Sequence, residues 1–371
     1  MARLGDAGTW SGGKVRDVSQ HLLQLTAAKQ PYNAMARKGR RVFNSKPEWP
    51  FQIEPASDTT PLADATDVAE AEFADYESLF GMLQGRAVWK RRAFAIGKKA
   101  QLMTQQYGGI KDKFKQYGII SMKALNRDME TINLGSQDSW TETVSGQARE
   151  QSRGIYRWLG GTATPTDLSI PSAARTPSGS RISTRTTASA VLESDIRDVM
   201  KSIADTTLNE SGDYVLFANT SLKQAFSNYA NYQSNSTNTV MPLRRFNTDA
   251  SKKTIMLDVT AYESDFGKLK IHPHFYLPNG SSSYATVYAA TADNGLGRAA
   301  ADQKMDAALA ASLTVYGYLL NMDYTEINMV QAPMMGTLPE QGGGPRGYVD
   351  AIWVHSLLNP QAHGMFYYVT P

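Results

Sequence analysis

The stretch RAVWKRRAFAIGKKAQLMTQQYGGIKDKFKQYGIISMKALNRDMETINL, residues 86–134, is the one around which the rest of the chain can be arranged. Its first half is basic and favours β structure, and it breaks at the glycine pair 108–109. Within residues 110–134, apolar side chains then recur at steps of three and four, which places them on one face of a helix. They are Ile119, Met122, Leu125, Met129 and Ile132. A helix of that length would be roughly 35 Å long, so we expect it to form the spine of the fold.

Length and composition limit the class of protein. A chain of 371 residues can bury a sizeable core and can form one large domain or two to three ordinary ones. The absence of cysteine excludes disulfides, cysteine-bound metals and a thiol nucleophile, and it fits assembly in a reducing cytoplasm. No apolar run approaches the ~20 residues of a membrane span, and the start of the sequence lacks the apolar core of a signal peptide. We therefore expect a soluble protein with no membrane partner.

Charge alternates along the first third of the chain, although the net charge is only +3. Residues 1–50 hold nine Lys or Arg against three acids, residues 51–80 hold eight acids and no base, and residues 86–123 hold ten bases against the single acid Asp112. The first block is rich in glycine at its start and has one short amphipathic helix before Pro31. It predicts an extended basic arm.

Strand-like runs at residues 49–53 and 87–103 bracket the acidic block, which predicts a long two-stranded ribbon with an irregular acidic tip. An isolated two-stranded ribbon is marginal in water, so we expect it to lie on another domain or on a neighbouring subunit. Solvated charged faces are the plain alternative. The basic and aromatic run at residues 89–94 could also hold a nucleic-acid strand by phosphate contacts and stacking. We favour pairing with the acidic block across a subunit boundary, because an equally concentrated opposite charge lies in the same ribbon.

The second half of the chain mixes helices and strands, after an irregular Ser- and Thr-rich connection at residues 162–190. Helical patterns cover residues 193–206, 221–232 and 302–313. Strand patterns cover residues 214–218, 253–262, 269–277, 285–290, 314–320, 347–358 and 365–370. Residues 329–347 are rich in Met, Pro and Gly and predict a loop.

Candidate catalytic and metal-binding residues are few. The cluster His272-Pro273-His274 is the most ligand-like, but the sequence supplies no carboxylate or third histidine nearby, and a metal needs three or four ligands. Asp128 and Glu130 lie on different faces of the predicted helix, so we expect them to be structural ion-pair partners. The remaining histidines have no serine in an elbow motif to pair with. We predict no catalytic residue, no metal and no cofactor, and hence no enzyme.

The order of these parts resembles that of the major capsid protein of tailed bacteriophages, with the Hong Kong-ninety-seven-like fold. The segments that carry the resemblance are QPYNAM (residues 30–35), KPEW (46–49), NRDME (126–130), RGIYRWL (153–159), VTAYESDFG (259–267) and NPQAHG (359–364). The fifth segment is the most specific, and the segments fall in the expected order over nearly the whole chain.

The resemblance implies an α+β fold with four parts. They are an N-terminal arm (1–48), an extended β-hairpin E-loop ribbon (49–105), the spine helix with part of the peripheral domain (106–190), and the axial domain with returning peripheral-domain strands (191–371). We expect the ribbon to contact neighbouring subunits through charged side chains. The candidate intersubunit residues are Glu70, Glu72, Asp75, Glu77, Lys90, Arg91, Arg92, Lys98 and Lys99.

The resemblance also implies a function. Copies of the chain would form pentamers and hexamers of an icosahedral shell around packaged double-stranded DNA, assembled in the host bacterial cytoplasm and found in the virion. The basic arm could face that DNA without sequence readout. The candidate DNA-facing residues are Arg37, Lys38, Arg40 and Arg41. A separate scaffolding protein, a portal and possible decoration proteins are the implied partners. The rival hypotheses are a nucleic-acid-binding protein that uses residues 86–123 and a hydrolase with an unrecognised site.

Overall fold

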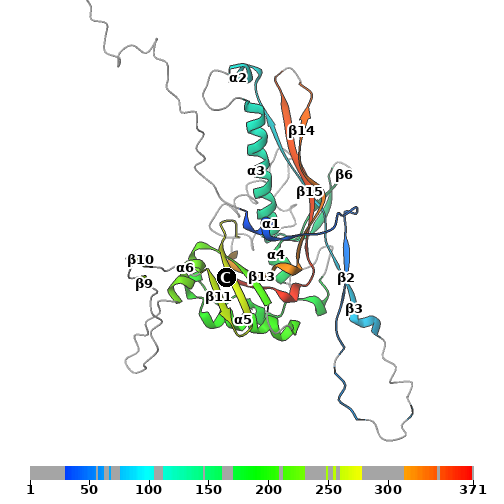
Figure 1. The fold of residues 1–371 in the computed structure, drawn as a ribbon. Helices are drawn as coiled ribbons and strands as arrows, with labels where there is room; N and C mark the ends of the chain where they lie inside the picture. The colour runs from blue at the N-terminus through cyan, green and yellow to red at the C-terminus, as the bar shows by residue number, and fades with distance from the viewer. Residues whose placement is uncertain are drawn as a thin grey trace, which may run out of the picture. The chain divides into compact units, whose positions relative to one another are not determined.

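The computed structural model describes most of the chain from residue 30 onward, and its secondary structure mixes helices and strands (Figure 1). The described residues are 30–55, 57–61, 67, 76–103, 112–144, 147–160, 170–208, 212–229, 248–249, 254–255, 260–277, 313–340 and 343–369. Contacts divide them into two compact units. Residues 91–125 and 333–350 belong to the small unit, and residues 30–90, 126–332 and 351–371 belong to the large unit.

The large unit contains a six-stranded mixed sheet. Its strands are β7 (Arg181–Ile182), β8 (Gly212–Ala218), β11 (Ala261–Ser264), β12 (Gly267–Pro273), β13 (Leu313–Asn321) and β16 (Gly364–Val369). They lie in the order β11-β12-β8-β13-β16-β7. β8 is parallel to β12 and antiparallel to β13, and β16 is antiparallel to β13 and parallel to β7. Mixed pairing of this kind needs connections that pass over the sheet, and helices supply them.

Two helices of the large unit, α5 (Glu193–Thr207) and α6 (Thr220–Tyr229), pack on this sheet (Figure 1). The carboxylate of Asp195 accepts a hydrogen bond from the Leu192 amide at 2.8 Å, which closes the first turn of α5. Apolar side chains from both helices and from the four strands β8, β12, β13 and β16 then form one buried core. The helix predicted at residues 193–206 and the strands predicted at residues 214–218 and 314–320 are confirmed. The predicted helix at residues 221–232 and strand at residues 365–370 are confirmed as far as residues 229 and 369, and their remaining residues lie outside the described part of the chain.

The second sheet has the order β1-β14-β15-β4. Its strands are β1 (Arg37–Lys38), β14 (Thr325–Leu338), β15 (Arg346–Leu357) and β4 (Val88–Ala95). The predicted loop at residues 329–347 is therefore wrong over its first half, because β14 continues to Leu338. Met, Pro and Gly composition favours a loop locally, but pairing with β15 overrides that preference.

The predicted ribbon is partly wrong as well. β2 (Glu48–Gln52) pairs antiparallel with β3 (Phe80–Gln84), and the basic strand β4 lies beside β15 instead. The end of the predicted basic strand is the helix α2 (Lys98–Met103). The acidic block still lies between two paired strands, as expected. Strand β3 was not predicted because it contains Gly81, and glycine disfavours a strand. A Cβ at Gly81 would lie only 2.2 Å from the ring of Phe51, so this position needs a residue without a side chain.

The spine helix is confirmed as α3 (Lys113–Asn133). The Asp112 carboxylate accepts hydrogen bonds from the amides of residues 114 and 115 and so caps its start. Leu125 and Met129 are buried as predicted, but Ile119 is 51% exposed. Two successive steps of three residues, each about 60° short of a full turn, rotate Ile119 away from the face that Leu125 occupies. Among the described residues, no helix has the length and apolarity to cross a membrane.

The remaining elements are short. They are α1 (Pro31–Met35), α4 (Ile155–Gly160), the hairpin of β5 (Trp140–Val144) and β6 (Gln147–Gln151), and the pair β9 (Thr248–Asp249) and β10 (Thr254–Ile255). Single turns of 3-10 helix occur at residues 76–79, 172–174, 178–180, 188–190, 322–324 and 360–362. A short helix before Pro31, a strand at residues 285–290 and a helix at residues 302–313 were also predicted. These residues lie outside the described part of the chain, except for residue 313, which begins β13.

Candidate assembly surfaces and the buried polar cluster

The strands β2 and β3 present apolar side chains to solvent. In their register, Pro50 lies opposite Met82 and Gln52 lies opposite Phe80, so these pairs share one face of the hairpin. Phe80 is 58% exposed and Met82 is 54% exposed. We call Pro50, Phe80 and Met82 the hairpin face. The opposite face carries Trp49, Phe51 and Leu83, which are buried or half-buried. A two-stranded hairpin with one exposed apolar face is suited to contact another protein surface.

The candidate DNA-facing residues lie together on residues 37–46, which we call the strap. Arg37, Lys38, Arg40 and Arg41 are all exposed. Arg37 is 3.5 Å from the Glu326 carboxylate and remains 63% exposed. A charge so exposed gains little from such a pair, so the four cations stay available to solvent or to a polyanion.

Arg41 stacks over the ring of Phe43, with 5.5 Å between its guanidinium carbon and the ring centroid. Phe43 is 87% exposed. A cation over an exposed ring forms a flat surface that can contact a base or another side chain. The sequence did not single out this pair, although basic and aromatic residues so close together are a recognisable pattern.

The basic strand β4 contacts an aromatic and an acidic side chain of β15 in the same chain. The guanidinium of Arg91 lies 4.8 Å from the centroid of the Tyr348 ring and 3.6 Å from the carboxylate of Asp350. Tyr348 and Asp350 are two residues apart on β15, so they share one face of the sheet. The ring of Tyr348 also covers Gly336 of β14. Asp350 of the same chain is therefore one partner of Arg91, and the contact of Arg91 with the acidic block of a neighbouring copy stays a prediction.

The other candidate intersubunit residues lie on separate elements. Arg92 is exposed on β4, and Lys90 is half-buried. Lys98 and Lys99 are exposed at the start of α2. Glu77 is exposed in the 3-10 turn at residues 76–79. The acidic candidates Glu70, Glu72 and Asp75 lie outside the described residues.

A buried carboxylate joins three distant segments of the large unit. Glu130 of α3 is fully buried, and its Oε1 accepts hydrogen bonds from the amide of Tyr32 at 2.8 Å and from Nε2 of His274 at 2.7 Å. Its Oε2 accepts a hydrogen bond from the amide of Asn33 at 2.8 Å. The amide of Tyr276 donates to Nδ1 of His274 at 3.1 Å. An acceptor at Nδ1 places the proton on Nε2, so the imidazole is neutral.

The position of Glu130 bears on two predictions, that no carboxylate lies near His272 and His274 and that Glu130 is a structural ion-pair partner. A carboxylate does lie next to the His272–His274 cluster, because α3 brings Glu130 across 144 residues of sequence. Glu130 has the predicted structural role, but its partners are two amides and a neutral imidazole. Among the residues that the structure describes, no group of three or more His, Cys, Asp or Glu could hold a metal ion.

Tyr32 extends the cluster to β15. Its hydroxyl lies 2.6 Å from Nε2 of His355, whose Nδ1 lies 3.2 Å from the carbonyl of Arg153. Since a carbonyl only accepts, His355 carries its proton on Nδ1, and its Nε2 accepts a hydrogen bond from the Tyr32 hydroxyl. Burial raises the pKa of Tyr32, with a further increase from the Glu130 charge, and burial lowers the pKa of His355 to about 4. Both groups are therefore neutral in the fold at pH 7.

Asn133, one turn beyond Glu130, completes the attachment of α1. Its amide nitrogen donates to the side-chain oxygen of Asn33 at 3.0 Å, and its side-chain oxygen accepts from the Trp353 indole at 3.0 Å. We call Glu130, His274, Tyr32, His355 and Asn133 the polar cluster. Each member is buried, and the hydrogen bonds among them and to their neighbours connect α1, α3, β15 and the end of β12.

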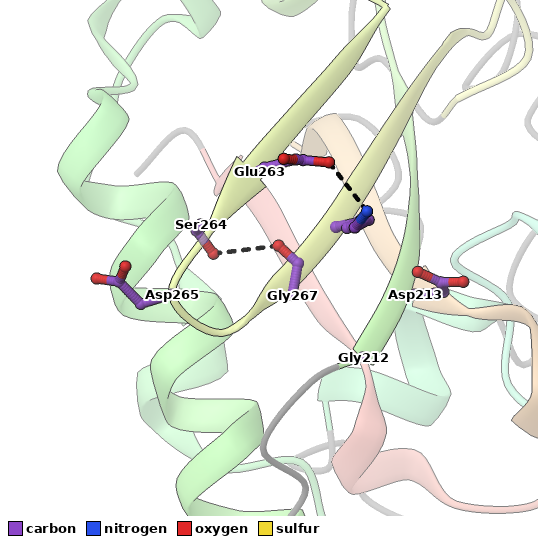
Figure 2. Close-up of a pocket in the computed structure, with 7 residues that line it drawn as sticks. Gly212, Asp213, Glu263, Ser264, Asp265 and Gly267 are labelled. Carbon is purple, nitrogen blue, oxygen red and sulfur yellow. Dashed lines mark hydrogen bonds and ion pairs between the residues drawn. The ribbon is translucent and has the colours of Figure 1, made fainter.

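A shallow hollow of about 220 Å³ lies at the turn between β11 and β12 (Figure 2). It is lined by Gly212, Asp213, Glu263, Ser264, Asp265, Gly267 and Lys268. The Ser264 hydroxyl is 3.5 Å from the Gly267 carbonyl and accepts the Phe266 amide at 3.2 Å, so it shapes the turn. The described residues that line the hollow include no histidine that could pair with Ser264.

Known proteins resemble this chain in sequence and in fold. A family model described as SU10 major capsid protein matches residues 5–370. The fold is similar to that of the solved structures "Asymmetric unit of bacteriophage PhiM1 mature capsid" (TM-score 0.59, 8% identity, covering 100% of this chain and 98% of that one) and "Capsid structure of the Cyanophage P-SCSP1u" (0.56, 12%, 96% and 93%). It is also similar to a structure titled "Gordonia phage Cozz" (0.54, 10%, 100% and 99%). No curated protein sequence matches.

Proposed function

The chain belongs to the SU10 major capsid protein family and is therefore a structural protein of a phage virion, and from that premise we propose how its copies assemble. They form pentamers and hexamers that close into an icosahedral shell around packaged double-stranded DNA. The subunit has no catalytic role in this proposal. Assembly takes place in the cytoplasm of the host bacterium.

The hairpin face is the observation that carries the proposal. Pro50, Phe80 and Met82 expose apolar surface on a hairpin of only two strands. Leaving such side chains in water forgoes the free energy of their burial, on the order of 1.5–3 kcal/mol for a large apolar side chain. A second copy of the chain that covers this face would recover it. We propose that apolar contacts at the hairpin supply most of the adhesion between subunits.

Charged residues would set the register of these contacts. Arg92, Lys98 and Lys99 are exposed and carry one sign, and the acidic block around Glu77 carries the other. Complementary charge mainly improves specificity and association rate. We keep Glu70, Glu72, Asp75, Lys90 and Arg91 in this set as proposals. Arg91 also pairs with Asp350 within its own sheet.

The finer architecture follows the Hong Kong-ninety-seven-like plan as a proposal. Residues 1–48 would be the N-terminal arm, 49–105 the E-loop region, 106–190 the spine helix with part of the peripheral domain, and 191–371 the axial domain with returning strands. The six-stranded sheet of the large unit supports the last assignment, since it contains five of the nine described strands after residue 190. Within this plan the basic strap would face DNA through its phosphates, without reading sequence. A scaffolding protein, a portal and decoration proteins are the proposed partners.

Negative-stain electron microscopy of the purified protein, expressed with and without a scaffolding protein, tests the proposal. We expect closed shells from the wild-type chain. The double variant Phe80→Ser/Met82→Ser should remain folded and lose shell formation, because it makes the hairpin face polar. Phe275→Ser, at another exposed phenylalanine of the large unit (64% exposed), is the matched control and should keep the shells. Wild-type protein that stays a small oligomer, or shells that persist in the hairpin variant, would refute the proposal.

A further inference from the structure

The strap is lightly attached to the rest of the large unit. Of residues 37–46, only Val42 is buried and Gly39 is half-buried, and the others are exposed. The parallel pairing of β1 with β14 covers two residues, and the amide of Gly39 donates to the Ile327 carbonyl over 3.3 Å. A segment with so few buried contacts opens at low cost in free energy.

The two ends of the strap are held more firmly. At its C-terminal end, the amides of Ala87 and Gly85 donate to the carbonyls of Ser45, inside the strap, and of Pro47, just after it, both at 2.9 Å. Before its first residue, α1 is fixed by the polar cluster. Ala36 is buried and its amide donates to the carbonyl of Tyr32, so the strap begins directly from the segment that Glu130 holds.

Glu130 is the strongest element of that attachment. It accepts the amides of two consecutive residues, Tyr32 and Asn33, on separate oxygens. A carboxylate can accept at both oxygens, whereas the isosteric glutamine would turn an NH2 group toward one of the amides. Undocking of α1 would also leave a buried carboxylate without two of its donors, which is expensive. The free energy of undocking therefore depends on this one side chain.

We infer that α1 and the strap, residues 31–46, open and close as one local unit of the fold, and that Glu130 sets the fraction of time for which this unit is docked. Closing fixes the cations of the strap, of which Arg37 and Lys38 pair with β14. Opening releases them together. The inference concerns the subunit alone and does not depend on shell formation.

Hydrogen exchange followed by mass spectrometry on the purified full-length protein tests the inference. Wild type and Glu130→Gln are compared in the same assembly state. We expect peptides within residues 31–46 to exchange about tenfold faster or more in the variant, the loss expected for hydrogen bonds to a charged group. Peptides from α5 and β13 should exchange at the wild-type rate. Unchanged exchange in residues 31–46, or an equal acceleration in α5 and β13, would overturn the inference.

Two further variants keep the test decisive. Asp195→Asn makes the same carboxylate-to-amide change at the start of α5, where Arg185 donates to both oxygens, and it should accelerate α5 and leave residues 31–46 unchanged. Tyr32→Phe removes only the hydroxyl that bonds His355 and is the milder change if Glu130→Gln does not fold. It should accelerate residues 31–46 by a smaller factor. A Tyr32→Phe protein with wild-type exchange in those residues would contradict a shared docking unit.

Discussion

The six-stranded sheet and the β2–β3 hairpin both belong to the large unit, but they treat apolar side chains in opposite ways. The sheet buries its apolar residues against α5 and α6 in one continuous core. The hairpin leaves Phe80 and Met82 more than half exposed. The first region therefore supplies the stability of the subunit, and the second keeps apolar surface for contacts outside it. Variants that change one property and leave the other unchanged can break or sharpen this contrast.

The largest effect is expected from Phe366→Ala in the core. The side chain is fully buried on β16, and its removal leaves a cavity that the surrounding residues fill only in part. The free energy of unfolding should fall by about 3–5 kcal/mol. Phe80→Ala on the hairpin removes the same ring and should change that free energy by less than about 0.5 kcal/mol. Urea unfolding of the unassembled subunits measures both, and similar losses in the two variants would refute the contrast.

Acid should also act on the buried region. Burial lowers the pKa of His355 to about 4 and of His363 to about 3, and the proximity of His355 contributes to the lower value. Between the unfolded pKa near 6.5 and these folded values, the unfolded chain binds more protons than the folded chain. Stability is therefore fully present above pH ~6.5 and is lost as the pH falls through 4, by about 3 kcal/mol for His355 alone.

Urea unfolding at a series of pH values between 7 and 4 measures this loss. His355→Gln should be less stable than wild type at pH 7, because it disturbs the bond to Tyr32, but its stability should depend less on pH. Residues 48–84, which include the hairpin, contain no histidine. An equally steep pH dependence in the variant would show that other groups cause the acid sensitivity.

Local periodicity was enough to predict much of the large unit. The spacing of Ile196, Val199, Met200 and Ile203 predicted α5, and all four are buried. These patterns work because each helix shows its buried face within a few residues of sequence. The spine helix was predicted in the same way. The prediction that Ile119 is buried is wrong, because two successive steps of three residues turn this side chain away from the face that Leu125 occupies.

Pairings between distant segments could not be predicted. Nothing near residues 49–53 indicated that β3, rather than the basic strand, is the partner of β2. The alternation of side chains along a strand shows which of its faces is buried, but it does not show which strand pairs with it. Likewise, Glu130 and His274 are 144 residues apart, and the local pattern around each one does not identify the other as its partner. The hairpin face and the polar cluster both depend on contacts between segments that are distant in the sequence. The candidate sites were therefore less predictable than the core.

A moderate effect is expected at the turn between β11 and β12. Gly267 has a φ of 128°, and a Cβ there would lie 2.2 Å from the carbonyl oxygen of Gly212. Gly267→Ala should therefore lower the free energy of unfolding by about 1–3 kcal/mol. Gly97→Ala is the matched control, since nothing lies within 4 Å of its Cβ position. A thermal shift measurement that finds equal melting temperatures for the two variants would contradict the strain at Gly267.

The smallest effect on the subunit is expected from charge reversal at Arg92, Lys98 and Lys99 to Glu. All three are exposed, so the free energy of unfolding should change by less than about 0.5 kcal/mol. Arg91 stays unchanged, because Asp350 is 7% exposed and would lose the guanidinium beside it.

Shell assembly should respond to the same triple variant much more than stability does. Reversed charges would repel the acidic block of a neighbouring copy at low salt, and salt screens that repulsion over about 10 Å at 0.1 M. Light scattering should show impaired assembly at low ionic strength and recovery as salt is added, the opposite of the wild-type trend. Identical assembly of both proteins at every salt concentration would show that these charges do not contribute to the interface. The proposed contact would then consist of the hairpin face alone.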